Sequence, residues 1–147
     1  MYEFLGCRVG DYMVKPATTI SAGSTIAEAL ELFGRLDFNM LPVVDRGRLV
    51  GVVSKFDILK IFAFTPKSVV PSYDELVSHP VSEVLTRNYI SVDAETPLTR
   101  VLQQMVEQRI ASVPVIDKQG SLIGVISRTD ILHALKRCVV PETAERR

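Results

Sequence analysis

The chain has 147 residues, enough for one compact domain or two very small ones. Lys plus Arg and Asp plus Glu both number 17, so the formal net charge is zero and the basic excess of a nucleic-acid-binding protein is missing. No apolar run approaches the roughly 18 residues of a membrane span, and the N-terminus lacks the pattern of a signal peptide. We therefore expect a soluble cytoplasmic protein that neither inserts into a membrane nor binds nucleic acid.

The first half of the chain is predicted to alternate strands and helices. A short β-branched stretch precedes a segment with apolar residues at helical spacing, which begins after the N-cap candidates Ser24 and Thr25. Two β-rich runs then flank a turn at residues 46–48, which predicts an antiparallel hairpin. The predicted elements are a strand at 18–21, a helix over about 26–36, strands at 41–45 and 49–53, and a helix over about 55–62.

A connector at residues 63–80 follows, and it is too short to form a domain. It contains three prolines, and residues 72–76 are a candidate short helix within it. We interpret its His79, which precedes a proline, as a surface residue.

The second half of the chain repeats the first. When Val9 is placed over Val81, the two halves align without a gap until the hairpin turn, where the second copy has one extra residue. Beyond that turn, Asp57 aligns with Asp130. The second copy is predicted to have a helix capped by Thr96, with Pro97 as its first residue, then strands at 113–117 and 122–126 and a helix over about 128–137.

Both copies carry the pattern h-P-V-h-D, a glycine-containing turn, and G-h-h-S-x-x-D-I, at residues 41–58 and 113–131. This ordered set, present twice, resembles the cystathionine-β-synthase (CBS) domain. The resemblance implies an α/β fold of two tandem βαββα CBS repeats, packed as one pseudo-two-fold CBS pair, or Bateman module. The predicted boundaries are a first repeat at 7–62, the connector at 63–80, a second repeat at 81–138 and a C-terminal tail at 139–147.

The resemblance also implies a function. CBS pairs commonly bind AMP, ADP, ATP or S-adenosylmethionine in clefts between the copies, form homodimers, and regulate an enzyme or a transporter. We therefore expect a homodimeric regulatory module, active in signal transduction, that takes an adenosine nucleotide or S-adenosylmethionine as regulatory ligand and requires no cofactor. No fused catalytic domain is evident, so the regulated enzyme or transporter is expected to be a separate protein.

The candidate site lies where the last strand of each copy runs into the last helix. Ser54 and Asp57 lie at this junction in the first copy, and Ser127 and Asp130 repeat them in the second. A helix N-terminus offers unpaired N–H groups to an anion, and an ionised carboxylate accepts hydrogen bonds from two neighbouring ribose hydroxyls. Further candidates beside these residues are Lys55, Arg128 and Thr129.

The same Ser-x-x-Asp spacing is also a helix capping box, which explains these residues without any ligand. In the family, ligands also touch the first strand, which corresponds here to Thr18 and Ile90, and the pair of residues before h-P-V. That pair is Asn39-Met40 in the first copy and Ala111-Ser112 in the second. Neither pair is basic, which favours a ligand with little negative charge, and Met40 is equally a candidate for core packing.

Two alternatives to a ligand sensor remain open. A ligand-free dimerisation scaffold, with the Ser and Asp residues serving only as caps, fits the non-basic pairs. An enzyme fits less well, because the sequence has no metal-ligand cluster, no Gly-rich phosphate loop and only two histidines. The repeat aligns His133 with Lys60, so it gives His133 no special role. The two cysteines, Cys7 and Cys138, are interpreted as inert thiols, which a disulfide could join only if the termini meet.

Overall fold

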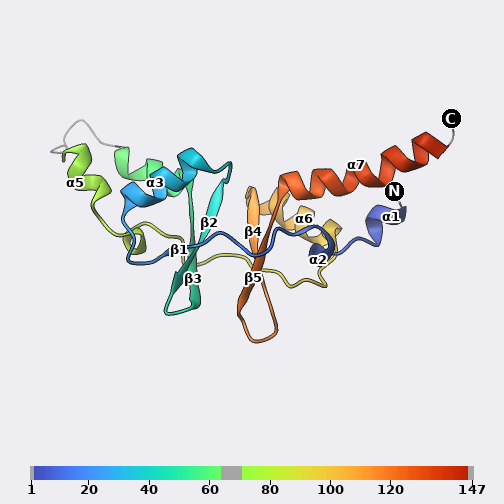
Figure 1. Ribbon diagram of the computed structural model, residues 1–147, viewed down its shortest axis with the longest axis horizontal. Coiled ribbons are helices and arrows are strands. Elements are labelled where there is room, and N and C mark those ends of the chain that lie inside the picture. Colours follow the sequence, from blue (N-terminus) through green and yellow to red (C-terminus); the bar gives the residue numbers. More distant parts are fainter. Residues whose placement is uncertain (1, 64–70, 146–147) are drawn as a thin grey trace. The chain divides into compact units, whose positions relative to one another are not determined.

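A computed structural model describes residues 2–63 and 71–145 (Figure 1). It confirms the mixed α/β composition predicted from the sequence. The elements, in chain order, are α1 (Tyr2–Leu5), α2 (Val9–Tyr12), β1 (Ile20–Ser21), α3 (Ile26–Arg35), β2 (Met40–Asp45), β3 (Arg48–Ser54), α4 (Lys55–Leu59), the 3-10 helix η1 (Lys60–Phe62), α5 (Tyr73–Val77), the 3-10 helix η2 (Val81–Glu83), α6 (Leu98–Gln108), β4 (Ser112–Ile116), β5 (Leu122–Ser127) and α7 (Arg128–Glu145).

The hairpin of the first repeat forms as predicted. Strands β2 and β3 pair antiparallel, and the turn between them places both Arg46 and Gly47 at positive φ, 52° and 78°. Two consecutive residues of this kind match the right-handed twist of the paired strands. Strand β1 pairs in parallel with β2, which gives the order β1-β2-β3. It is shorter than the predicted 18–21, because only its two residues pair with β2.

The first long helix also begins where the sequence indicates. The hydroxyl of Thr25 accepts a hydrogen bond from the backbone N–H of Glu28 at 3.2 Å, so Thr25 is the N-cap of α3. The residues Ile26, Ala29 and Phe33 are buried along one face of the helix, which confirms the amphipathic pattern.

The second repeat departs from prediction at the start of its first helix. The N-cap of α6 is Pro97, with an extended ψ of 141°, and Leu98 is the first helical residue, so the prediction of Thr96 as the cap is wrong. The hydroxyl of Thr96 is bonded elsewhere, since it donates to Asp93 Oδ1 at 3.0 Å and accepts from the Asp93 N–H at 3.3 Å. A local turn therefore holds the side chain that was expected to cap the helix.

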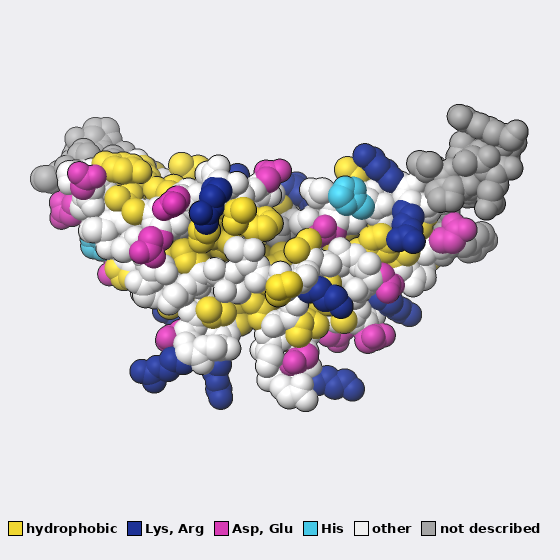
Figure 2. All heavy atoms as spheres, in the orientation of Figure 1, with side chains coloured by type: hydrophobic (Ala, Val, Ile, Leu, Met, Phe, Trp, Pro, Cys, Tyr) yellow, Lys and Arg dark blue, Asp and Glu magenta, His cyan; other side chains and the backbone are white. Residues whose placement is uncertain are grey.

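The second hairpin, β4 with β5, pairs antiparallel as predicted. Its final helix α7 continues past the predicted end near Arg137, because neither glycine nor proline interrupts residues 128–140. In the connector, α5 begins after Ser72, whose hydroxyl accepts from the Glu75 N–H at 3.2 Å, so the predicted short helix is present. On the face shown in Figure 2, the tips of both hairpins carry basic side chains.

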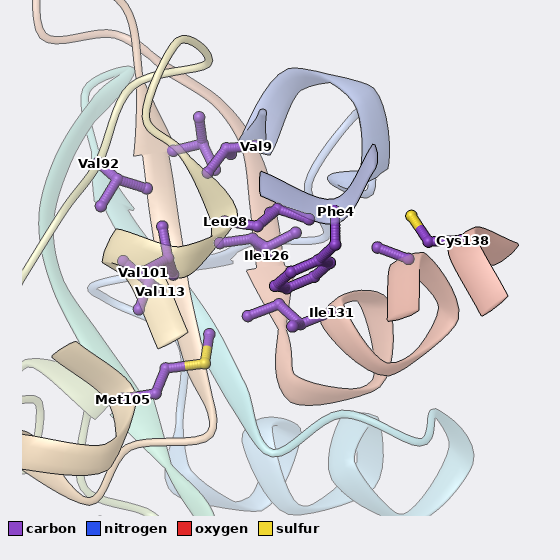
Figure 3. Packing of buried hydrophobic residues seen from close by; sticks show 12 residues of the cluster. Phe4, Val9, Val92, Leu98, Val101, Met105, Val113, Ile126, Ile131 and Cys138 are labelled. Carbon is purple, nitrogen blue, oxygen red and sulfur yellow. The ribbon is translucent and has the colours of Figure 1, made fainter. Parts of the chain in front are cut away.

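The chain divides into two compact units that do not follow the sequence repeats. One unit joins residues 1–17 to residues 90–147, and the other comprises Thr18–Tyr89. Each unit has its own core. In the first of these units, Phe4 from α1 points toward Ile131 on α7, and Val9 from α2 is fully buried (Figure 3). Residues 4–13, which include the start of the first repeat, therefore complete the core around the second.

A short extended segment crosses the hairpin of each unit in the same way. Val14 exchanges two backbone hydrogen bonds with Val125, of 2.9 and 3.0 Å, and Thr86 exchanges two with Val52, of 2.7 and 3.0 Å. A glycine lies beside each crossing. A Cβ added to Gly51 would come within 2.6 Å of the Thr86 carbonyl oxygen, and one added at position 124 would come within 2.7 Å of the Val14 oxygen. Both crossings therefore require glycine.

The two cysteines belong to the same unit, since Cys7 packs against the core cluster that contains Cys138. Both thiols are free. Burial raises the pKa of the Cys138 thiol, and the neighbouring Cys7 thiol raises it further. The thiolate is the reactive form of cysteine, and the raised pKa lowers the fraction of Cys138 that is thiolate.

Candidate functional site

The predicted site of the first copy begins at the end of β3. Ser54 has extended backbone, and α4 starts at the next residue. The Ser54 hydroxyl accepts from the Asp57 N–H at 3.1 Å, and the Ser54 N–H donates to Asp57 Oδ2 at 2.8 Å. These two bonds form a complete capping box, as the sequence pattern allowed. Asp57 is buried, with 6% of its surface exposed, and is the one buried charged residue in the described part of the chain.

The other oxygen of Asp57 is also bonded. Thr86 donates its hydroxyl to Asp57 Oδ1 at 3.2 Å, and the Lys60 ammonium lies 3.2 Å from the same oxygen. The Lys60 ammonium also lies 5.5 Å from the centre of the Phe56 ring. Thr86 and Lys60 were not among the predicted site residues. The alignment of the two repeats contains the sequence signal for both residues. It places Val14 opposite Thr86 and His133 opposite Lys60.

The second copy builds the same junction with Ser127 and Asp130, at the start of α7. Asp130 Oδ2 accepts from the Ser127 N–H at 2.8 Å and from the Ser127 hydroxyl at 2.9 Å, and the Asp130 N–H donates back to the hydroxyl at 3.3 Å. Asp130 is partly exposed. Among the residues that the structure describes, its Oδ1 has no hydrogen-bond or ion-pair partner.

The unequal bonding of the two carboxylates follows from two sequence differences. The position that Thr86 occupies in one unit is occupied in the other by Val14, which makes the same backbone bonds but has no hydroxyl. The repeat position of Lys60 is occupied by His133, which is exposed on α7. Neither replacement bonds to Asp130, so both oxygens of Asp57 have donors within the chain, whereas Asp130 has one oxygen without a donor among the described residues.

The predicted residue pairs lie next to these junctions. The Lys55 N–H donates to the Asn39 carbonyl at 3.4 Å, and the residue that follows, Met40, pairs with Ser54 across the hairpin. Met40 is 8% exposed, which agrees with its alternative interpretation as a core residue.

The second copy repeats this arrangement. The Arg128 N–H donates to the Ala111 carbonyl at 2.9 Å, and Ser112 pairs with Ser127. The hairpin register therefore brings each predicted pair to the junction of its own copy. The side chains of Arg128 and Thr129 are exposed beside Ser127.

The predicted first-strand residues make no hydrogen bond to the capping boxes in the described part of the chain. Thr18 is exposed and precedes β1, whereas Ile90 packs against the core cluster of its unit. His79 is exposed, as predicted, with its Nδ1 2.7 Å from Glu83 Oε2.

A shallow hollow of about 380 Å³ lies at the other end of β4. Its lining includes Asp93, Arg100, Asp117 and Gln104, and the Oε1 of Gln104 is buried without a hydrogen-bond partner. Ser112 begins β4 and Ile116 ends it, so this hollow is separate from the Ser127–Asp130 junction. None of the predicted site residues lines it.

Comparison with known proteins identifies both copies. The family model for the CBS domain matches residues 9–63 and 81–137. An L-aspartate semialdehyde sulfurtransferase of Methanocaldococcus jannaschii is 31% identical over 84% of this chain, but the match spans only 22% of that protein. A CBS domain-containing protein of Dictyostelium discoideum is 29% identical over 90% of this chain and 94% of its own length.

Solved structures give the same fold. The CBS domain pair of protein MJ0100, in complex with 5′-methylthioadenosine and S-adenosyl-L-methionine, has a TM-score of 0.73 and 29% identity and covers 87% of this chain and 94% of its own. CBSX2 in complex with AMP has a TM-score of 0.76 and 26% identity and covers 90% of this chain and 98% of its own. The predicted fold of two tandem CBS repeats is thereby confirmed.

Proposed function

The chain belongs to the CBS domain family, and on that basis we propose that it is a regulatory module that binds an adenosine-containing ligand. The similar domain pairs were solved with 5′-methylthioadenosine, S-adenosyl-L-methionine and AMP, which share the adenosine group. AMP, ADP, ATP and S-adenosylmethionine are therefore the candidates. The ligand is regulatory, and the module itself carries out no catalysis.

The observation that carries the proposal is the strand-to-helix junction that ends in Asp130. Its carboxylate has an unbonded oxygen and is partly exposed, so it is available to hydroxyl donors. A vicinal diol such as that of ribose supplies two such donors. The sequence predicted binding residues in both copies: Ser54, Lys55, Asp57, Thr18, Asn39 and Met40 in the first, and Ser127, Arg128, Thr129, Asp130, Ile90, Ala111 and Ser112 in the second. We propose the second set for binding, because it contains the carboxylate with an unbonded oxygen.

The charge around the junctions favours a ligand of low negative charge. The residues that the hairpin register places beside the capping boxes are Asn39, Met40, Ala111 and Ser112, none of which is basic. Arg128 is exposed and able to pair with one phosphate group. We expect AMP or S-adenosylmethionine to bind more tightly than ATP.

A ligand-free scaffold is the second candidate, and the capping boxes support it. Both boxes have their full set of backbone bonds, so they stabilise α4 and α7 whether or not a ligand binds. Cap and ligand site are compatible, because the capping bonds of Asp130 use only Oδ2. Direct measurement of binding separates the two functions.

We also propose that the module is a cytoplasmic homodimer that transmits its ligand state to a partner enzyme or transporter. Exposed apolar side chains on three helices support self-association, namely Phe56 and Leu59 on α4, Val106 on α6 and Leu132 on α7, which are 50–71% exposed. Sedimentation of the wild type and of the variants Phe56→Gln and Leu132→Gln tests this part. A wild type that sediments as a monomer would contradict it, and Leu5→Gln, at an exposed site on α1, is the control.

A thermal-shift screen with AMP, ADP, ATP, S-adenosylmethionine and NADH tests ligand binding. A compound that binds only the folded state raises the melting temperature as its concentration increases. We expect a shift with at least one adenosine compound, and loss of that shift in Asp130→Asn. Glu31→Gln, an exposed change on α3 with the same loss of charge, is the control. The absence of a shift with every compound would support the scaffold.

A further inference from the structure

The two capping-box carboxylates differ in how many hydrogen bonds they still can accept. Asp57 accepts from the Ser54 N–H on one oxygen and faces both Thr86 and Lys60 on the other. Asp130 accepts both of its bonds on Oδ2, from a single residue, Ser127. A carboxylate has about four acceptor positions, so Asp57 has one left on a buried group, whereas Asp130 keeps a complete oxygen.

A ribose diol cannot bind Asp57 without displacing an internal donor. Because one acceptor position is left, the second hydroxyl of the diol would have to replace the Thr86 hydroxyl or the Lys60 ammonium on Oδ1, and Thr86 is held there by the two backbone bonds that it exchanges with Val52. Loss of hydrogen bonds to a buried charge is costly, and a neutral hydroxyl replaces an ammonium poorly. Asp57 is therefore bonded as a structural residue.

The second copy has the same backbone but a different side chain at the crossing. Val14 forms the same pair of backbone bonds with Val125 that Thr86 forms with Val52, and its side chain carries only methyl groups. Because the backbone geometry is shared, the difference between Thr86 and Val14 decides whether the carboxylate receives an internal hydroxyl. The chain thus contains a matched pair of sites that differ in one donor from the crossing segment and one from the last helix.

From this contrast we propose that the module binds one ribose-containing ligand per chain, through Asp130, and that Thr86 and Lys60 close the corresponding position at Asp57. The inference rests on the proposed function, since it specifies which copy carries the site. It assigns Thr86 and Val14 as the residues that decide how many ligands bind to each chain. It also makes the first copy a structural counterpart whose Asp57 holds the crossing segment in place.

Isothermal titration calorimetry with AMP and with S-adenosylmethionine tests the proposal on the full chain. We expect a stoichiometry of one per chain in the wild type. Val14→Thr, which places a hydroxyl near Asp130 Oδ1, should weaken binding about fivefold, the equivalent of one hydrogen bond. Asp130→Asn should weaken it more than tenfold, because the lost acceptor is charged. Ser54→Ala and Asp57→Asn should change the dissociation constant less than twofold.

The outcomes separate this inference from the proposed function. Binding of two ligands per chain, or loss of binding in Asp57→Asn or Ser54→Ala with Asp130→Asn unaffected, would overturn the inference while leaving a ligand-binding module. No binding of either compound to the wild type would overturn both. Circular dichroism melts show whether Asp57→Asn is folded, and Ser54→Ala provides the same test with the carboxylate intact.

Discussion

Thr86 lies 29 residues beyond Asp57 in the sequence, yet its hydroxyl donates a 3.2 Å hydrogen bond to that buried carboxylate. Thr86→Val keeps the shape of the side chain and removes the donor. We expect the free energy of unfolding to fall by about 1–2 kcal/mol, since a buried charged acceptor loses one partner. Urea denaturation measures the change. Thr99→Val, at an exposed position on α6, is the control and should be nearly neutral; equal losses in both variants would contradict a role for the bond.

The glycines at the two crossings give a second prediction. Gly51→Ala and Gly124→Ala each place a Cβ within 2.7 Å of a backbone oxygen of the crossing segment, which has to move away. We expect each to lower the free energy of unfolding by about 1–3 kcal/mol. Gly34→Ala, which meets no atom within 4 Å on α3, should instead raise it by about 0.5–1 kcal/mol. Thermal denaturation of the three variants measures the two decreases and the increase. A Gly51→Ala protein as stable as the wild type would show that the Thr86 backbone does not pack closely against position 51.

Removal of the second cap gives a third prediction. Ser127→Ala abolishes the hydroxyl that both accepts from the Asp130 N–H and donates to its carboxylate. The expected loss is about 1–2 kcal/mol, at the upper part of the range for helix caps. Thr129→Ala, an exposed change two residues away whose side chain makes no hydrogen bond in the described part of the chain, serves as the control for urea denaturation. A loss no larger than that of the control would show that the hydroxyl does not cap α7.

The buried Cys138 thiol and the half-buried Tyr12 phenol predict how the free energy of unfolding depends on alkaline pH. Burial raises the pKa of Cys138 above its ordinary value of 9.0 and that of Tyr12 above 10.0. The unfolded chain therefore loses these protons at lower pH than the folded chain does. Their contribution to stability is fully present below about pH 9 and is lost as the pH rises through the folded pKa values. Urea denaturation at several pH values should show this decline.

The variant Cys138→Ala tests the origin of the decline. Without the thiol, the free energy of unfolding should fall less steeply above about pH 9 than it does in the wild type, even though the cavity lowers stability at every pH. An identical slope in the two proteins would show that Cys138 does not contribute. Tyr12→Phe provides the same comparison for the phenol.

The regular elements could be predicted because their signals are local. The apolar spacing after Thr25 and the turn at Gly47 lie within a few residues of the structure that they specify. The predicted cap at Thr96 was wrong because its hydroxyl had a closer partner in Asp93. Local patterns indicate which residues are able to cap a helix, but competition among neighbours decides which one does.

The candidate site could be predicted only in part for a different reason. The sequence placed Asp57 and Asp130 at equivalent positions, and in the structure the carbonyls of Asn39 and Ala111 accept from the first helical residue after each junction serine. Their different bonding depends on Thr86, a residue far away in the chain that arrives through a backbone crossing. No periodicity in the sequence indicates such a long-range contact. The alignment of the two repeats does show the difference between Thr86 and Val14, on which the different bonding of the two carboxylates depends.

The compact units of the structure do not coincide with the two repeats of the sequence. Residues 1–17 belong to the same compact body as residues 90–147, while residues 77–85, which include the start of the second repeat, complete the core around the first. Cutting the chain between its sequence repeats would therefore leave two fragments, each carrying a segment that the other needs. Truncation to residues 18–89 would retain one compact unit as a continuous segment, whereas the other unit requires residues 1–17 to be rejoined at residue 90 by rearrangement of the gene.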